Sequence, residues 1–160
     1  MQILLTTTPQ SRAIRAAKTK PDVDSIVDSL SVEDKELLGC SAEDNWEYLS
    51  LDQGEHVLKR SIKYVDGEPA SFFDLLDDVD HINVALATRI EYRGNGYASK
   101  VAKDAMNWLT KHPEVSKGRE VIWGVREDNL GSVSIANSLG FELDDNSYND
   151  GWVNYVYRTN

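Results

Sequence analysis

Three stretches in the middle of the chain have the apolar pattern of β-strands. Residues 57–65 loosely alternate apolar and polar side chains, and residues 70–76 and 81–88 are mostly apolar. Polar pairs separate the stretches, Asp66-Gly67 after the first and Asp77-Asp78 after the second. Asp-Gly is a frequent hairpin turn, so the pattern predicts three strands in an antiparallel meander.

Helical periodicity begins after the third stretch. Apolar residues recur there at the spacing of one helix face, at Ala98, Val101, Ala102, Ala105, Met106 and Leu109. A second helix is expected over 129–139, with an apolar face made of Leu130, Val133, Ala136 and Leu139. A short strand is expected before it, at 120–125. A closing pair of strands is expected after it, across a polar loop, at 141–143 and 152–157 with the loop at 144–151.

The first third of the chain is predicted to be one short strand followed by helices. Residues 2–7 have strand composition, and Thr8-Pro9 supplies a capping hydroxyl followed by proline at the first helical position. Helical segments are expected on both sides of Pro21, over 11–18 and 22–30. Further helix caps are expected at Ser31 (with Asp34 in the place of the usual Glu), Gly39 and Ser41. Together the segments predict an α/β protein with a mixed sheet.

Composition excludes several classes of protein. The chain of 160 residues is most simply one domain, over residues 1–160. Its apolar stretches fall short of the roughly 20 residues that cross a bilayer, and its start lacks the basic region of a signal peptide. Cys40 is the only cysteine, which fits a reducing, cytoplasmic setting.

The charge is unevenly distributed. Residues 1–80 carry 17 acidic and 8 basic side chains, whereas residues 81–160 carry 10 and 9. An acidic half argues against nucleic acid as the main partner, because phosphate binding needs a basic surface. It suits a cationic ligand, although an acidic surface also serves solubility alone.

The segment from Glu91 to Lys100 joins the third predicted strand to the first strong helix. A glycine-rich turn that opens directly into a helix can bind phosphate. Its backbone N–H groups point outward, and the helix N-terminus carries partial positive charge. The simpler alternative is that Asn95-Gly96 forms an ordinary tight turn.

Two motifs in this region resemble those of the GNAT superfamily of N-acetyltransferases. Residues 93–98, Arg-Gly-Asn-Gly-Tyr-Ala, match the superfamily's Arg/Gln-x-x-Gly-x-Gly/Ala signature. A second block is similar to the downstream GNAT helix and contains Trp123, Asn129, Ser132, Ala136 and Gly140-Phe141. The resemblance covers residues 56–158 and extends to residues 8–55 only in their helical character.

The resemblance implies a fold and a co-substrate. The fold is a mostly antiparallel sheet of about seven strands with one splayed parallel pair, flanked by about four helices. The co-substrate is acetyl-CoA, without a metal. Its pyrophosphate would bind at the turn, formed by Arg93, Gly94, Asn95, Gly96, Tyr97, Ala98 and Ser99. Ala87 and Thr88 would face pantetheine, and an N–H near Leu86 or Ala87 would hold the thioester carbonyl. Asn129 and Ser132 would bind pantetheine or serve only as helix caps.

The residues that many family members use in catalysis are absent at the matching positions. A Tyr that protonates the leaving thiolate is replaced by Ala136, and a Glu base is replaced by Gly124. We expect Asp80 and His81 at the mouth of the cleft as candidates for the base. A hydroxyl of Tyr148 or Tyr155 is the candidate acid. Each of these side chains is equally explained as an ordinary strand or turn residue.

The sequence therefore predicts an N-acetyltransferase that modifies a small cationic molecule or a peptide or protein N-terminus. Two alternatives stay open. One is a GNAT-fold domain that binds acyl-CoA or a protein partner without turnover, and the other is a toxin-like enzyme acting on aminoacyl-tRNA. Selection of the acceptor is expected to depend on residues 8–55, the hairpin near Asp66 and the loop at 144–151. An exposed strand edge in the closing hairpin would favour a homodimer.

Overall fold

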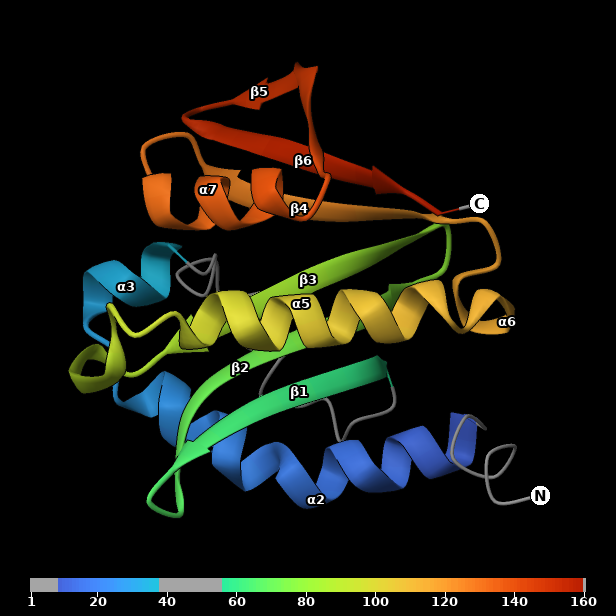
Figure 1. Ribbon diagram of the computed structural model, residues 1–160. Coiled ribbons are helices and arrows are strands. Elements are labelled where there is room, and N and C mark those ends of the chain that lie inside the picture. The colour runs from blue at the N-terminus through green and yellow to red at the C-terminus, as the bar shows by residue number, and fades with distance from the viewer. Residues whose placement is uncertain (1–8, 38–55, 160) are drawn as a thin grey trace.

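Six strands form one mixed sheet in the computed structural model, which describes residues 9–37 and 56–159 (Figure 1). Their order across the sheet is β1-β2-β3-β4-β6-β5. The expected strand at residues 2–7, the caps at Thr8, Gly39 and Ser41, and Cys40 lie outside the described residues. The strands are β1 Val57–Val65, β2 Glu68–Asp78, β3 His81–Thr88, β4 Glu120–Arg126, β5 Glu142–Asn149 and β6 Trp152–Arg158.

The first three strands form the predicted antiparallel meander. Asp66 and Gly67 both have positive φ, 51° and 81°, as the expected hairpin turn requires. The second turn was misplaced: it lies at Val79-Asp80, and Asp78 still pairs with His81 in the ladder. The carboxylates that suggested a turn are bound by side chains instead, Asp77 by Arg119 and Asp78 by Asn83.

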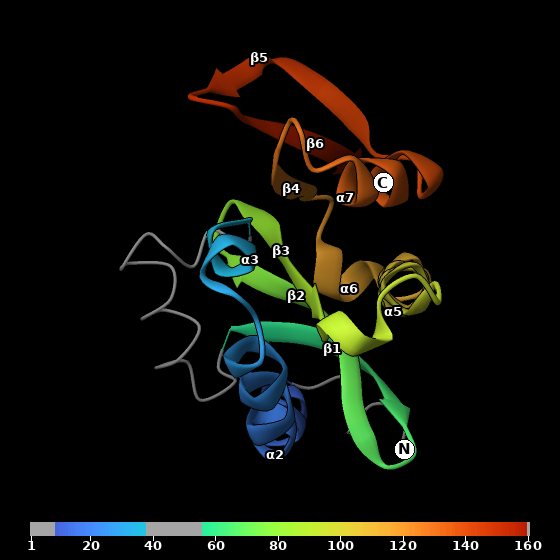
Figure 2. The same ribbon diagram turned by 90° about the vertical axis from the view of Figure 1, so that its left-hand side faces the viewer.

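The central feature of the sheet is its one parallel pair. β3 and β4 pair only at Ile82–Val121 and Asn83–Ile122, at the beginning of both strands. Beyond these residues the strands diverge, and Figure 2 shows β4 leaving the plane of β2 and β3. The expectation of a splayed parallel pair is confirmed.

The closing hairpin is longer than predicted. β5 continues to Asn149, and the turn is the pair Asp150-Gly151, again with positive φ at both residues. Most of the loop expected at 144–151 is therefore strand. The polar residues there lie where the register of β5 shifts, and Ser147 Oγ accepts from the Asn154 N–H across the irregularity at 2.8 Å.

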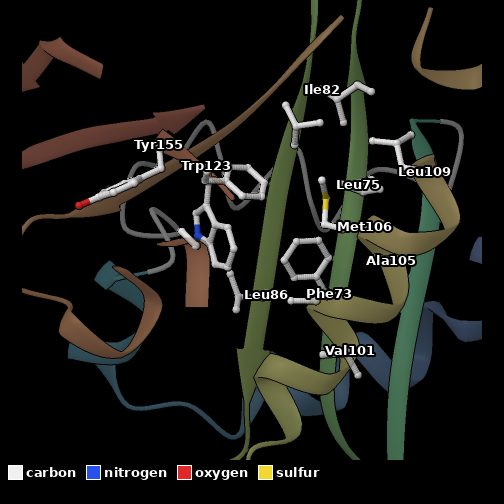
Figure 3. Packing of buried hydrophobic residues seen from close by; sticks show 14 of the residues in the cluster. Phe73, Leu75, Ile82, Leu86, Val101, Ala105, Met106, Leu109, Trp123 and Tyr155 are labelled. Carbon is white, nitrogen blue, oxygen red and sulfur yellow. The ribbon is translucent and has the colours of Figure 1, made fainter. Parts of the chain in front are cut away.

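Helices cover both faces of the sheet. α5 (Tyr97–Thr110) and α7 (Leu130–Ser138) lie on one face, and α2 (Pro9–Asp28) lies on the other (Figures 1 and 2). The main core lies under α5, where Phe73, Met106 and Trp123 pack together (Figure 3). The predicted apolar face of α5 is confirmed, because its buried residues are Val101, Ala102, Ala105, Met106 and Leu109.

α2 differs from the two segments expected on either side of Pro21. It is one helix of 20 residues that continues through the proline. Proline removes a backbone hydrogen bond, but the helix buries Ala16, Val23, Ile26 and Val27 against the sheet along one continuous side. Arg60 also donates to the Ala16 carbonyl oxygen at 2.7 Å and binds the fully buried Asp74. These contacts fasten α2 to β1 and β2.

The remaining helices are short. α3 (Val32–Leu37) begins with the expected cap, since the Asp34 N–H donates to Ser31 Oγ at 3.1 Å. A 3-10 helix, η1 (Ile90–Tyr92), follows β3, and α6 (Pro113–Ser116) replaces the loop expected after α5. In α7 the predicted apolar face was partly wrong: Ala136 is buried, but Leu130 is 73% exposed. None of the described helices is long and apolar enough to span a membrane.

Candidate functional site

A cleft of about 290 Å³ lies where β3 and β4 diverge. β3 supplies residues 84–88 and β4 supplies residues 123–125 to its walls. The other lining residues are Leu30, Asp34, Arg93, Ala98, Asn129, Gly131, Ser132 and Ile135. Ala87 packs with the α2 side of the sheet and Trp123 with the α5 side. Residues from both faces of the sheet therefore line the cleft.

Within the described residues, the last part of β3 presents to this cleft a backbone edge that β4 does not pair. Arg89 N–H donates to Ala70 of β2 at 2.9 Å, and the Ala87 carbonyl oxygen accepts from Ser71, also on β2. Backbone groups alternate sides along a strand, so the N–H and C=O of Leu86 point the other way, toward β4. No ladder pairing with β4 extends that far. The Leu86 amide is thus available to a ligand in the cleft.

The glycine turn adjoins the same end of β3. Gly94 and Gly96 have φ of 79° and 76°, which glycine adopts without strain, and no atom lies within 4 Å of a Cβ built on either. Asn95 Nδ2 donates to the Tyr92 carbonyl oxygen at 3.0 Å and braces the turn. α5 begins at Tyr97, one residue before the expected start. The turn is open to solvent and leads directly into a helix N-terminus.

A second helix N-terminus lies beside the cleft. α5 and α7 begin at the same end of the sheet, next to α3 (Figure 1). Asn129 caps α7 by accepting from the Ser132 N–H at 3.4 Å. Asn129 and Ser132 also line the cleft, so capping and a ligand contact are compatible. Two helix N-termini favour an anionic ligand here, because each carries partial positive charge.

Two charged side chains, Asp34 and Arg93, line the cleft within the described ranges, and they bind each other. Arg93 Nη2 lies 3.1 Å from Asp34 Oδ2, and Nη1 donates to Oδ1 at 3.3 Å. Burial would raise the pKa of Asp34, but hydrogen bonds from Arg93 and Ser31 and the charge of Arg93 lower it overall. Asp34 is therefore ionised at neutral pH. No sequence pattern indicates this pair beyond the helix cap at Ser31.

The structure does not bring Asp80 and His81 to the cleft. His81 begins β3 and Thr88 ends it, so the two lie about 23 Å apart at the rise of an extended strand. The His81 ring lies 3.2 Å from the Asp78 carboxylate and 3.0 Å from Asn83 Oδ1. Asp80 is exposed in the turn before it. The expectation that these residues lie at the cleft mouth is not met. β3 runs toward the cleft, and Asp80 and His81 stand at the end of the strand that is away from it.

The tyrosine candidates also lie outside the cleft lining. Tyr148 is 55% exposed on β5, and β6 separates that strand from β4. Tyr155 is buried opposite Trp123, and its ring extends away from Leu86 (Figure 3). Among the described lining residues there is no His, Cys, Tyr or Glu.

The two positions where the family pattern is broken have different surroundings. Ala136 is the fully buried residue of α7. Gly124 lines the cleft, and a Cβ added there would lie 3.5 Å from Asn154 Oδ1. Within residues 9–37 and 56–159 no group of three or more His, Cys, Asp or Glu could hold a metal ion.

The sequence between residues 34 and 142 matches the family model described as Acetyltransferase (GNAT) domain. The chain belongs to the GNAT acetyltransferase family. Membership assigns it to the acyltransferases and agrees with the sheet, the splayed pair and the turn described above. No curated protein sequence matches the chain.

Solved structures of this GNAT fold resemble the chain at low identity. PaiA N-acetyltransferase from Thermoplasma acidophilum, in complex with coenzyme A, is 12% identical with a TM-score of 0.62, covering 89% of this chain and 94% of its own. Campylobacter jejuni N-acetyltransferase PseH, with acetyl coenzyme A, is 13% identical with a TM-score of 0.53, covering 82% and 94%. A GNAT-family acetyltransferase from Streptococcus pneumoniae is 14% identical with a TM-score of 0.53, covering 62% and 65%. At these identities the likeness establishes the fold.

Proposed function

We propose that this GNAT protein transfers an acetyl group from acetyl-CoA to a primary amine. The observation that carries the proposal is the cleft between β3 and β4, which adjoins a glycine turn and two helix N-termini. Family membership supports acyl transfer. Coenzyme A and acetyl coenzyme A in the PaiA and PseH structures support the choice of co-substrate.

The turn fits the pyrophosphate of such a ligand. Arg93, Gly94, Asn95 and Gly96 are exposed, and the two glycines leave open space where side chains would otherwise stand. The N–H groups of Tyr97, Ala98 and Ser99 belong to the first turn of α5, where no carbonyl of the helix can accept from them. These donors and the helix dipole would bind the phosphates.

β3 fits the pantetheine arm. An extended chain that lies along an unpaired strand edge takes main-chain hydrogen bonds as an added strand would. Ala87 and Thr88 line the cleft, and the Thr88 hydroxyl is held 2.7 Å from Ser71 Oγ. On this path the Leu86 N–H would stabilise negative charge on the thioester carbonyl oxygen, as an oxyanion donor does. Asn129 and Ser132 would contact the arm from α7.

Catalysis in this proposal depends mainly on orientation and oxyanion stabilisation. Acetyl-CoA supplies an activated thioester whose thiol leaves with a pKa of about 8.5, so an enzymatic acid is not essential. Asp80, His81 and Tyr148 stand away from the cleft, and we assign them no step. The amine would lose its proton to water, and alignment of the two reactants would supply much of the acceleration.

A cationic acceptor fits the charge of the chain. Residues 1–80 contribute nine of the ten net negative charges. A cationic acceptor would be attracted toward this acidic half of the chain. The proposed acceptors are a small cationic molecule or a peptide or protein N-terminus.

Thiol release from acetyl-CoA measures this activity directly. We expect release above background with at least one member of a panel of polyamines, aminoglycosides and peptides with free N-termini. Release that is independent of the amine would indicate simple hydrolysis and contradict amine acetylation. The absence of release with every amine, although acetyl-CoA binds, would favour the second candidate.

The second candidate is a GNAT-fold module that binds acyl-CoA without turnover. The observation that favours it is the absence of a free titratable group among the described cleft residues, together with Ala136 and Gly124 at the usual catalytic positions. For both candidate functions we propose a cytoplasmic location. A homodimer through β5, whose outer edge ends the sheet, is proposed as well.

A further inference from the structure

The side chain that binds the Arg93 guanidinium is a carboxylate, that of Asp34. Asp34 binds the guanidinium at both terminal nitrogens and so joins α3 to the first residue of the glycine turn. The Asp34 side chain is 18% exposed and that of Arg93 is 45% exposed. A carboxylate thus stands where the phosphates of the proposed ligand would meet their nearest cation.

Arg93 has no free edge on which to bind a phosphate through two hydrogen bonds. A guanidinium offers such an edge between its two terminal nitrogens and another between Nε and a terminal nitrogen. Asp34 takes the first, and the Thr88 carbonyl oxygen accepts from Nε on the second at 3.3 Å. Two-point binding of a phosphate therefore requires Asp34 or Thr88 to give way.

Asp34 is the partner that can leave at lower cost. Thr88 is fixed in β3 by Ser71, whereas Asp34 belongs to a helix of six residues. The Asp34 carboxylate also accepts hydrogen bonds from Ser31, which lower its pKa together with Arg93. This cap remains when Arg93 departs, so the released carboxylate is not left without a partner.

We propose that Asp34 lowers the affinity of the site for acetyl-CoA, because the diphosphate must displace it from Arg93. The proposal rests on the proposed function, since it takes the turn to be the diphosphate site. The proposal goes beyond the proposed function because it assigns a role in cofactor affinity to Asp34, a residue that lies in the first third of the chain and outside the glycine motif. The competition is between two anions for one cation and needs no other change in the fold.

Titration calorimetry with CoA tests the competition on the full chain. Asp34→Asn keeps the size of the side chain and removes its charge. Glu33→Gln is the matched control, because it removes the same charge from the next residue, which is exposed on the same helix. We expect the Kd for CoA to fall about two- to fivefold in the Asp34→Asn variant, the range for a partly exposed ion pair, and to stay unchanged in the control.

A second ligand isolates the diphosphate. S-acetylpantetheine lacks it, so its Kd should be the same for wild type and both variants. An unchanged Kd for CoA in Asp34→Asn would overturn the proposal. A higher Kd would also overturn it and would show that Asp34 positions Arg93 for the cofactor. An equal fall of the Kd for CoA in Glu33→Gln would also overturn the proposal, because the effect would then come from the net charge of the protein. If wild type binds CoA and the variants do not differ, only this inference fails; if wild type binds no CoA, the proposed function fails with it.

Discussion

Replacement of Gly96 by glutamate should abolish cofactor binding for a reason that can be separated from loss of stability. Gly96 has φ of 76°, where an L-residue costs about 1–2 kcal/mol, and space is open around its Cβ position. The variant should therefore fold, with a Tm lowered by about 2–8 °C for a chain of this size. Its carboxylate would stand at the proposed phosphate site and repel the ligand.

Gly67→Glu is the matched control. Gly67 lies in the β1–β2 hairpin with φ of 81° and equally open space, so strain and added charge are the same. Acetyl-CoA at a hundred times its Kd should stabilise a binding-competent protein by about 2.7 kcal/mol, or about 5–11 °C in Tm. We expect this shift, measured by differential scanning fluorimetry, in wild type and Gly67→Glu and not in Gly96→Glu. A full shift in Gly96→Glu would refute the assignment of the turn.

Three further predictions concern the scaffold around the cleft. Asp74→Ala removes the buried partner of Arg60 and should lower the free energy of unfolding by about 3–5 kcal/mol in a urea titration, while Asp24→Ala, on the more exposed pair with Lys20, should cost less than about 1 kcal/mol. Asn129→Ala removes the α7 cap and should lower the free energy of unfolding by about 0.5–2 kcal/mol, whereas Asn129→Ser keeps a capping oxygen and should retain most of that stability. Equal losses of stability in the two variants would argue against capping. Burial and the hydrogen bond to Asp22 raise the pKa of Tyr64 to about 12, so neutral Tyr64 stabilises the fold below pH 10 and this contribution is lost as pH rises through 12. Ultraviolet titration should show one tyrosine ionising at a lower pH in Asp22→Asn than in wild type, because the charge of Asp22 is removed while the burial remains.

The fold was largely predictable because its elements depend on local patterns. The strand at 81–88 and the apolar face of α5 follow from periodicity, and the Asp66-Gly67 turn follows from backbone preference. The errors arose where tertiary contacts override local signals. α2 continues through Pro21 because one side of it is buried along its length, and β5 extends through polar residues because β6 pairs with it.

The part of the candidate site proposed to bind the cofactor was predictable from the sequence, and the remaining residues of the site were not. The glycine turn and the start of α7 form sequence motifs, because phosphate binding and capping restrict a few adjacent residues. Asp34 reaches Arg93 across 59 positions, and no local pattern records that contact. Asp80 and His81 were expected at the cleft because they stand at one end of β3, but residues 84–88, toward the other end, are the ones that line it.

The most direct test of the central claim is amide chemical-shift mapping as acetyl-CoA is added to the 15N-labelled protein. The proposed function predicts the largest shifts at the Leu86 and Thr88 amides, in the turn from Gly94 to Ser99, and at the start of α7. The amides of β5, on the far side of β6, should stay unchanged. Shifts confined to β5 and β6, or none at millimolar acetyl-CoA, would contradict a cofactor site between β3 and β4.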